Sequence, residues 1–510
     1  MTNTALRSRR APFLLAAAVS FFAAALSHAQ VGDLNNEVAR AIAGHKLSGT
    51  RIGISIIDMD TGAALASVHA TDPFTPASNM KILTTGASLM VLGPDFSFRT
   101  ELIKDGDRLI VKGAGDPSLG DPLVLKESEP KLTVSDLVSA LAGAVTKSGM
   151  TDVREIVLDD RVFDREYVPS TWPPEQLDRS YCAEVCGITF HANVLAFFPG
   201  PSPQGPGSPP IYSTEPDARW LRVDVRARTV ADGKNAVSVA REDENHFVLR
   251  GDVRFQTQAP IEVTLHDPAL FFGRLLAQSL SDAGVHVAKA GDQGDPAVRL
   301  ADPAEQLPAG QTIAVVRTPI ADVLRRCNAD SENLYAECLL KSMGHAITKE
   351  PGSWANGGSV LRMMITQHLG ADDAASTTII DGSGMSRGNL VAPATLTKWL
   401  AALASDPKTR DTFTESLATP GVGTLRHRFR DGNLVNTVRG KSGYITGTRC
   451  LSGYVISPAG HRVCYSVMVN DVNTDDETRD SLTLHEEVVH IADHWLASHQ
   501  TADATPKSGG

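Results

Sequence analysis

One stretch decides the fold: Pro76-Ala-Ser78-Asn-Met-Lys81-Ile-Leu-Thr-Thr-Gly-Ala-Ser-Leu-Met90. It predicts a mostly buried helix, because Pro76 suits a first helical position and apolar side chains dominate the residues after Asn79. Ser78 and Lys81 are three residues apart, so their side chains can meet on one helix face. A serine hydroxyl becomes a good nucleophile when a nearby base takes its proton, and a neutral lysine can be that base. The pair therefore indicates covalent catalysis.

This motif needs support from elsewhere in the chain, because Ser-x-x-Lys is common by chance. Ser128–Lys131 and Ser405–Lys408 also match it, both in polar stretches broken by proline. For Lys81 to be neutral, its pKa must fall by about three units from its usual value of about 10.4. Burial, a helix N-terminus and a second cation would all lower that pKa. The hypothesis therefore requires another cation and a hydroxyl that relays protons.

Length and composition indicate a soluble, exported protein of several domains. The chain has 510 residues, 42% hydrophobic and 21% charged, so about two to four domains are expected. Three arginines (Arg7, Arg9 and Arg10) precede an apolar run over residues 11–26, and small residues then offer a cleavage site. We interpret residues 1–29 as a signal peptide, with a membrane anchor as the alternative. After cleavage no transmembrane anchor is expected.

Charge and cysteine content narrow the function classes further. Removal of the three arginines takes the formal net charge from −11 to −14, which disfavours nucleic acid or anionic lipid as the main partner. Six cysteines in an exported protein suggest disulfides, and the spacings favour local pairs. These pairs would be Cys182 with Cys186, Cys327 with Cys338, and Cys450 with Cys464. None of the spacings matches a zinc site, so no metal is predicted.

The order of predicted elements suggests one sheet built from both ends of the chain. A short helix (Leu34–Ala43) precedes strands Arg51–Asp58 and Ala64–Val68. Near the C-terminus, strands are expected at Asn436–Arg439, Cys450–Ile456 and Arg462–Val469, before a helix at Ser481–Ala497. Between Thr318 and Ala404 helical periodicity dominates, with helices expected at 358–369 and 393–404 and a strand at Thr377–Ile380. An antiparallel sheet of this kind tolerates a long insertion between its halves.

The middle of the chain has a different character. Short β runs and turns fill residues 97–311, broken by a Pro/Gly/Ser loop at Pro199–Pro210 and by one clear helix at Ala269–Ala283. We therefore predict an α+β fold with β-rich inserted domains.

Two further motifs supply the groups that Lys81 requires. Ser331-Glu-Asn333 offers a hydroxyl that can relay a proton and an amide that can hold a carbonyl and the lysine, although capping of a helix is the alternative interpretation. Lys441-Ser442-Gly443 ends a predicted strand and offers the second cation, a hydroxyl and a close approach for a peptide. The same tripeptide at residues 147–149 looks like a helix C-cap, and the copy at 507–509 lies in the tail, so neither has that strand context.

In this order, Ser-x-x-Lys, Ser-x-Asn and Lys-Ser-Gly resemble the penicillin-recognising serine transpeptidase/carboxypeptidase superfamily. The chain is most similar to its D-alanyl-D-alanine carboxypeptidase/endopeptidase family, the class C low-molecular-mass penicillin-binding proteins (peptidase family S13). Three more stretches carry this resemblance: Lys112-Gly-Ala-Gly-Asp-Pro-Ser118, Ser331-Glu-Asn-Leu-Tyr-Ala-Glu337 and Asp381-Gly-Ser-Gly-Met-Ser-Arg-Gly-Asn-Leu390. The gap of 253 residues between Ser78 and Ser331 also resembles the family, which carries two extra domains there.

The resemblance implies a serine β-lactamase/transpeptidase-like domain, an antiparallel sheet flanked by helices, with β-rich domains inserted between Ser-x-x-Lys and Ser-x-Asn. The expected parts are a signal peptide (1–29), a first part of the main domain (30–96), two nested inserted domains (97–311), a second part (312–499) and a disordered tail (500–510).

It also implies roles for particular residues. Ser78 would form the acyl-enzyme, Lys81 would be the base and Ser331 would relay the proton. The substrate would be bound by Asn333, Lys441, Ser442, Gly443 and Tyr444. Lys441 would hold the terminal carboxylate and lower the pKa of Lys81, and the backbone N–H groups of Ser78 and Tyr444 would stabilise the oxyanion. The common family pattern has threonine where Ser442 stands.

The implied reaction removes the terminal D-alanine of peptidoglycan stem peptides or cleaves D-alanyl cross-links, without metal or cofactor. β-Lactams would be covalent inhibitors. The expected location is the periplasm, with a secreted or cell-wall-associated protein as the alternative.

Two other functions fit parts of the sequence. Gly384-Met-Ser386-Arg-Gly388 matches a nucleophile elbow, and Asp471 and His485 follow in the order of an α/β-hydrolase-type esterase. An elbow, however, turns directly from strand to helix, whereas Ser386 lies six residues after Ile380, where the predicted strand ends. A penicillin-binding sensor or scaffold of the same fold, with little turnover, is the other alternative. A β-lactamase would need a deacylating base, and the sequence offers no identifiable glutamate for it.

Overall fold

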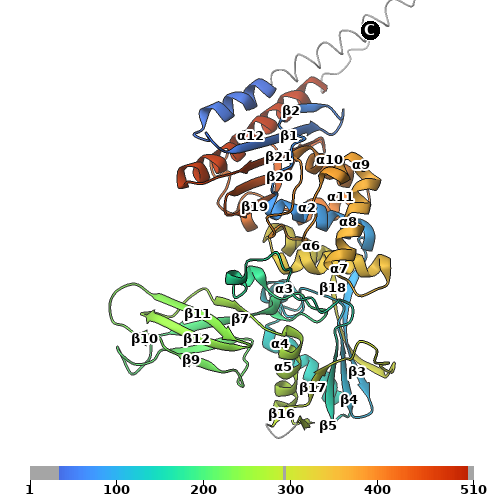
Figure 1. The fold of residues 1–510 in the computed structure, drawn as a ribbon, viewed down its shortest axis with the longest axis vertical. Coiled ribbons are helices and arrows are strands. Elements are labelled where there is room, and N and C mark those ends of the chain that lie inside the picture. The colour runs from blue at the N-terminus through green and yellow to red at the C-terminus, as the bar shows by residue number, and fades with distance from the viewer. Residues whose placement is uncertain (1–33, 291–293, 504–510) are drawn as a thin grey trace, which may run out of the picture.

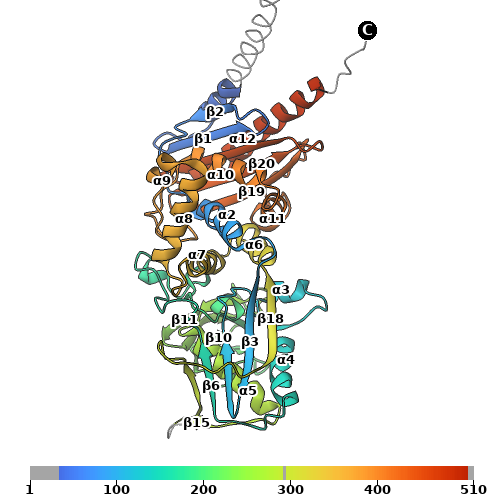
Figure 2. The same ribbon diagram turned by 90° about the vertical axis from the view of Figure 1, so that its right-hand side faces the viewer.

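The structure, a computed structural model, describes residues 34–290 and 294–503. The predicted signal peptide and residues 504–510 of the predicted tail lie outside this part. The molecule is elongated, with a sheet-and-helix domain at one end and the segment between the first two motifs at the other (Figures 1 and 2). Within the described ranges, no helix is both long and apolar enough to cross a membrane.

The main sheet joins the two ends of the described chain. Its strands are β1 (Arg51–Asp58), β2 (Ala64–Val68), β19 (Thr437–Ile445), β20 (Thr448–Ile456) and β21 (Arg462–Asn470). They lie in the order β19-β20-β21-β1-β2, and every neighbouring pair is antiparallel. This arrangement confirms the predicted α+β class with an antiparallel sheet formed from both ends.

Alternation along β1 gives the sheet two different faces. Ile54 and Ile56 belong to a core shared with α12 (Asp475–Asp503) and the helix over residues 34–44. Ser55 points the other way, and its hydroxyl lies 2.8 Å from the Thr397 hydroxyl of α10. Helices therefore cover both faces, as Figure 1 shows.

The helices on the second face carry the central motif. They are α2 (Met80–Leu92), α6 (Ile320–Ala329), α7 (Asn333–Thr348), α8 (Trp354–Leu369), α9 (Ala371–Ser376), α10 (Pro393–Ser405) and α11 (Arg410–Ser416). A 3₁₀ turn, η1 (Ala77–Asn79), precedes α2, whose residues are buried from Met80 to Leu89. A Cβ on Gly86 would lie 2.6 Å from Nε1 of Trp399, so glycine lets α10 pack directly against α2.

The inserted segment, which we define as β3 to β18, contains two large hydrophobic cores and a small third cluster of Ile103, Ile110, Val157 and Ala301. The first surrounds a five-stranded sheet in the order β17-β6-β4-β3-β18, in which β4, β6 and β17 are parallel neighbours. Its strands are β3 (Ser97–Asp105), β4 (Arg108–Lys112), β6 (Glu155–Asp159), β17 (Val298–Leu300) and β18 (Gln311–Pro319). Its helices are α3 (Pro122–Glu127), α4 (Val134–Lys147) and α5 (Pro268–Asp282).

The second core lies between two small sheets, β13-β7-β8 and β10-β12-β11, with β9 beside β12. The strands are β7 (Val194–Gly200), β8 (Ile211–Glu215), β9 (Val223–Val225), β10 (Arg228–Thr229), β11 (Ala236–Asp243), β12 (His246–Val253) and β13 (Ile261–Thr264). Four two-residue strands complete the segment: β5 (Asp152–Val153), β14 (His286–Val287), β15 (Lys289–Ala290) and β16 (Asp295–Pro296).

A buried ion pair fastens the inserted segment to the helical layer. The carboxylate of Asp121, in the loop before α3, accepts hydrogen bonds from the Arg326 guanidinium of α6 at 2.9 Å and 3.1 Å. It also accepts one from the Tyr335 hydroxyl of α7 at 2.6 Å. Burial alone would raise the pKa of Asp121, but Arg326 and Tyr335 more than offset it and lower the pKa. Both helices that flank Ser331 are therefore tied to this segment.

Several predicted elements differ from those observed. Only the end of helix α4 was predicted, from the C-cap pattern at residues 147–149, and its start, where Thr133 and Asp136 form a capping box, was missed. The predicted strand Thr377–Ile380 is absent, and only an isolated bridge joins Thr378 to Leu390. Strand β18 continues past the predicted boundary at residue 311, since Pro319 still pairs with Ser97. Helix α12 extends further than expected at both ends.

The predicted disulfides are wrong. All six cysteines are free and buried. In the β20–β21 ladder Cys450 is opposite Met468 while Cys464 is opposite Tyr454, so the two thiols are not directly paired. Cys327 and Cys338 lie on different helices, α6 and α7. Sequence spacing alone does not carry the Cβ geometry that a disulfide requires.

Candidate active site

The candidate nucleophile stands on a tight turn against the main sheet. Ser78 lies in η1, and the Lys81 ammonium of α2 donates a hydrogen bond to its hydroxyl at 2.8 Å. The preceding residue, Ala77, has a φ of 46°, a conformation that the surroundings must hold in place. A Cβ on Gly384 would lie only 1.8 Å from the Ala77 carbonyl oxygen, so a glycine loop supports this turn from behind.

Lys81 is enclosed and fully hydrogen bonded. It is buried, and its Nζ also donates to Oδ1 of Asn333 at 2.7 Å and to the carbonyl of Ser383 at 3.1 Å. Burial lowers the pKa of Lys81, while the Cys327 thiol and the Glu337 and Asp381 carboxylates raise it in part. In its neutral form this nitrogen can accept the proton of Ser78 while its remaining hydrogens keep the other two contacts.

The second lysine pairs with the predicted relay hydroxyl. Lys441 donates from Nζ to the Ser331 hydroxyl at 2.8 Å and to the Ser442 carbonyl at 2.8 Å. Ser331 has a φ of 70°, in the loop between α6 and α7. Burial lowers the pKa of Lys441 well below its usual range, and the neighbouring Lys81 lowers it further. The charge of Lys81 therefore disfavours protonation of Lys441.

The edge of β19 completes this constellation. A Cβ on Gly443 would lie 2.8 Å from the carbonyl oxygen of Pro76 and 3.2 Å from the backbone nitrogen of Asn79. The strand thus runs directly against the nucleophile turn, where only glycine fits. Tyr444 is 68% exposed, and the Arg449 guanidinium lies 3.9 Å from its ring centroid. The structure brings seven of the eight sequence-predicted site residues together: Ser78, Lys81, Ser331, Asn333, Lys441, Gly443 and Tyr444. Ser442 contributes its backbone carbonyl, which accepts from Lys441.

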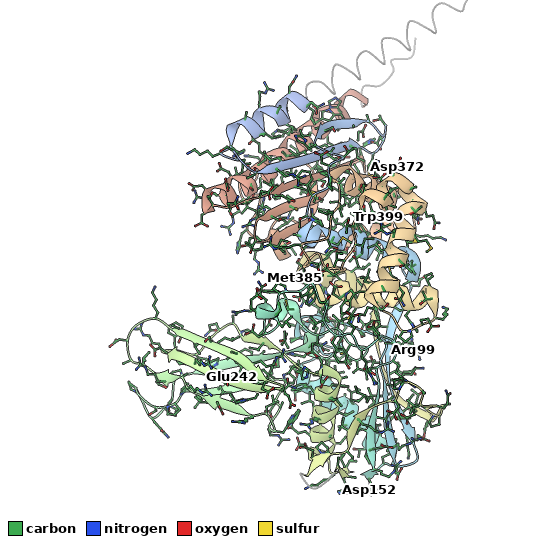
Figure 3. All side chains as sticks on the ribbon, viewed as in Figure 1. Arg99, Asp152, Glu242, Asp372, Met385 and Trp399 are labelled. Atoms are coloured by element: carbon green, nitrogen blue, oxygen red, sulfur yellow. The ribbon has the colours of Figure 1, made fainter. Side chains whose placement is uncertain are left out.

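A pocket of about 380 Å³ opens over these groups. Its lining comes from the main domain (Ser78, Ser331, Asn333, Met385, Arg387, Tyr444, Ile445 and Thr446) and from the inserted segment (Thr171, Pro173, Gln176 and Tyr181). Met385 lies where the two parts of the molecule meet (Figure 3). The side-chain amide of Asn333 donates to the Tyr181 carbonyl at 2.8 Å. No sequence motif marks the residues of the inserted segment that line this pocket.

The loop after Ile380 is a support rather than a second nucleophile site. Asp381 is buried and accepts hydrogen bonds from the backbone of Gly384 at 2.8 Å and of Ser386 at 2.6 Å, and from the indole of Trp172 at 3.0 Å. The Ser386 hydroxyl pairs with Thr171 at 2.5 Å.

His485 does not reach Ser386. Among the described residues, neither of its ring nitrogens has a hydrogen-bonded side chain as partner. With the predicted strand also absent, the nucleophile-elbow hypothesis has no structural support.

Two groups of potential metal ligands occur among the described residues, and neither includes a pocket residue. They are Glu184, His266 and Asp267, and His490, Asp493 and His494.

A serine hydroxyl beside a buried lysine, at the start of a helix packed on an antiparallel sheet edge, defines the penicillin-binding class of serine peptidases. The chain matches the model of the D-Ala-D-Ala carboxypeptidase 3 (S13) family over residues 34–493 and belongs to that family.

Curated relatives agree with this family. A D-alanyl-D-alanine carboxypeptidase of an Actinomadura species is 31% identical over 465 residues, which cover 87% of this chain and 82% of the relative. The D-alanyl-D-alanine carboxypeptidase DacB of Haemophilus influenzae is 24% identical, with 91% and 92% covered. The protein is thus a serine-type D-Ala-D-Ala carboxypeptidase by family.

A solved structure supports the fold independently. The crystal structure of penicillin binding protein 4 (dacB) from Haemophilus influenzae superposes with a TM-score of 0.68 at 20% identity, covering 90% of this chain and 99% of that chain. This likeness confirms the predicted transpeptidase-like fold with its inserted segment.

Proposed function

We propose that the protein hydrolyses the terminal D-alanyl-D-alanine bond of peptidoglycan stem peptides, and the equivalent bond in D-alanyl cross-links, through an acyl-enzyme on Ser78. One observation carries this proposal: Nζ of the buried Lys81 is within hydrogen-bond distance of both the Ser78 hydroxyl and the Asn333 amide oxygen.

Acylation would begin with proton transfer. Neutral Lys81 takes the Ser78 proton while Oγ attacks the carbonyl carbon of the penultimate residue. The resulting oxyanion would be held by the backbone N–H groups of Ser78 and Tyr444, each worth about 3–4 kcal/mol in comparable sites. Ser331 would pass a proton to the departing amine of D-alanine and regain one from Lys441, with which it is hydrogen bonded. The C–N bond breaks and an ester to Ser78 remains.

Hydrolysis of that ester would return the enzyme to its starting state. A water molecule adds its oxygen to the acyl carbon and gives a proton through Ser331 to Lys441, which acylation left neutral, and Ser78 leaves with the proton that Lys81 has held since acylation. Loss of this step alone would produce the penicillin-binding sensor, so turnover distinguishes the two functions.

Lys441 is well suited to bind the terminal carboxylate of the peptide. A carboxylate that enters the site would raise the pKa of Lys441 and favour its cationic form. Ser442 would add a hydroxyl contact, and Gly443 would let the peptide approach the β19 edge. Asn333 would hydrogen bond to the substrate amide in addition to its hydrogen bond with Lys81.

β-Lactams would acylate the same serine. The Haemophilus influenzae penicillin binding protein 4 has been solved in complex with a β-lactam, at a TM-score of 0.67 to this chain. We further propose that the protein acts on the cell wall after export, in the periplasm or attached to the wall. We propose the predicted division into 30–96, 97–311 and 312–499 for the domain boundaries, with the second boundary moved to the end of β18 at Pro319, because that strand pairs with β3 along its whole length.

Covalent labelling tests the nucleophile. The mature protein, Ser78→Ala and Ser386→Ala would be incubated with fluorescent penicillin and separated under denaturing conditions. We expect label on the wild type and on Ser386→Ala and none on Ser78→Ala. Label on Ser78→Ala would refute the assignment. Release of D-alanine from a pentapeptide, measured beside cleavage of a cross-linked dimer, tests turnover, and its absence in a labelled protein would favour the sensor.

A further inference from the structure

A buried carboxylate holds the loop whose Ser383 carbonyl binds Lys81. It belongs to Glu337 of α7, one helical turn after Asn333, and its side chain is fully buried. We propose that Glu337 is a positioning residue for Lys81, which fixes the Ser383 carbonyl against the lysine nitrogen and supplies a buried negative charge beside it. This inference rests on the proposed role of Lys81 as the base.

Both oxygens of Glu337 are used to hold one loop. Oε1 accepts a hydrogen bond from the backbone N–H of Ser383 at 2.8 Å, and Oε2 accepts one from that of Gly382 at 2.8 Å. The indole of Trp354 donates a third, to Oε2 at 2.9 Å. The carboxylate thus holds two consecutive peptide groups, and the second of them contains the Gly382 carbonyl. The Ser383 carbonyl belongs to the next peptide group, whose N–H, that of Gly384, donates to Asp381 at 2.8 Å, so Glu337 positions it through the backbone of Ser383.

The carbonyls of these same residues face α2. The Ser383 oxygen accepts from Nζ of Lys81 at 3.1 Å, and the Gly382 oxygen accepts from the Thr84 hydroxyl at 2.8 Å. A Cβ on Gly382 would lie 2.8 Å from the Ala336 carbonyl, so the loop lies directly on the α7 backbone. Helix α7 therefore reaches Lys81 twice: through the Asn333 side chain and through Glu337 and the loop.

The charges around Glu337 support a role beyond packing. Lys81 faces it from α2 and Asp381 from the loop. Lys341 of the same helix lies 3.8 Å from the ring centroid of Trp354 and is paired with Asp164 at 2.6 Å. Burial raises the pKa of Glu337 to about 7, and Asp381 adds to that rise, while the hydrogen bonds it accepts oppose it. In turn, the Glu337 carboxylate raises the pKa of Lys81.

The sign of the expected pH effect is set by that last interaction. Acylation requires neutral Lys81, so its rate falls at low pH as Lys81 gains a proton. Glu337 is charged above its pKa of about 7, so in that range its loss lowers the pKa of Lys81 further and moves the part of the acid limb that lies above about pH 7 to lower pH. Loss of a backbone acceptor also lets the Ser383 carbonyl move, so the maximal rate falls as well. A residue that merely packs would lower the rate without moving the limb.

The experiment measures the second-order rate of penicillin acylation between about pH 5 and pH 9 for four full-length proteins. They are the wild type, Glu337→Gln, Glu337→Asp and Glu184→Gln. Glu184 is a matched control in the inserted segment, since it is buried and accepts hydrogen bonds from His266 at 2.8 Å and from the Asp267 backbone at 3.0 Å.

We expect Glu337→Gln to lower the maximal rate by about tenfold and to move the acid limb to lower pH by at least about half a unit. Glu337→Asp keeps the charge and should lower the rate with the limb in place. Glu184→Gln should match the wild type in both respects. An acid limb at the wild-type pH in Glu337→Gln would overturn the inference. If the glutamine variant does not fold, a shifted acid limb in Glu337→Asp would overturn it instead.

Failure of the underlying site assignment would look different. If Ser78→Ala still takes label, or if the wild type has no acid limb, then the nucleophile or the base is wrong. If Ser78→Ala is unlabelled and only the Glu337 profiles match the wild type, then the inference about Glu337 alone is wrong.

Discussion

Replacement of Gly443 by alanine should separate the sheet edge from the nucleophile turn. The new Cβ would lie 2.8 Å from the Pro76 carbonyl oxygen, 3.1 Å from Cβ of Cys450 and 3.2 Å from the Asn79 nitrogen. Two of these atoms belong to the backbone, so they cannot rotate away. Relief to an ordinary contact of 3.4 Å requires the strand and the turn to part by about 0.6 Å.

The magnitude can be worked from that displacement. A misplacement of about 1 Å can reduce catalysis about 100-fold, so a shift of about half that size should lower the acylation rate by about tenfold. Overpacking should also destabilise the fold by about 1–3 kcal/mol. Stopped-flow acylation with a fluorescent penicillin and thermal unfolding measure the two effects separately.

Gly440→Ala is the matched control in the same strand. Its Cβ would lie 2.7 Å from the Tyr465 hydroxyl and 3.3 Å from Leu451, both side-chain atoms on the other face of β19. We expect a similar loss of stability with nearly unchanged acylation. Wild-type acylation in Gly443→Ala, or equal rate losses in both variants, would refute the argument that this glycine sets the distance between strand and turn.

Three further predictions concern stability and reactivity. Arg326→Ala leaves Asp121 buried without its cation, and we expect chemical denaturation to report a loss of about 3–5 kcal/mol; a variant as stable as the wild type would contradict the buried ion pair. Partial burial raises the pKa of Glu332, whose side chain is 35% exposed, toward about 7 from an unfolded value of 4.5, so protonation is favoured on folding. Glu332→Gln should therefore gain stability relative to the wild type as pH rises from 4.5 to about 7, and a flat difference would count against this. Finally, the six buried thiols should react with a disulfide reagent only after unfolding, and a reductant should leave the Tm unchanged.

Local patterns were enough to predict the main domain and the motif residues. The spacing of Ser78 and Lys81, and the strand that carries Lys441, are properties of short segments, and the structure retains both. The order of strands at the two chain ends also predicted the sheet, because an antiparallel arrangement needs no crossover.

The missed features depend on contacts between distant segments or on backbone atoms. The Ser383 carbonyl that binds Lys81 carries no side-chain signature, and Tyr181 reaches Asn333 from another part of the chain through its own carbonyl. The β-branched run at Thr377–Ile380 resembles a strand, yet it pairs only locally, and Asn389 accepts the Ile380 N–H at 2.8 Å. Tertiary contacts override propensity at such places.

The sheet built from both chain ends has a consequence for how the protein is made. Strands β1 and β2 leave the ribosome early, but β21, the neighbour of β1, begins only at Arg462. The inserted segment can pair β3 with β18 first, which brings Ser97 next to Pro319 and shortens the chain that must close.

We therefore expect the middle of the chain to fold before the N-terminal part of the main domain. This is the reverse of the usual order, in which N-terminal segments fold first. Nascent chains arrested before β19 should show a protease-resistant inserted segment and a sensitive N-terminal region; resistance of both would contradict this order. The main domain, by contrast, cannot close until its last strands, β19 to β21, have been synthesised.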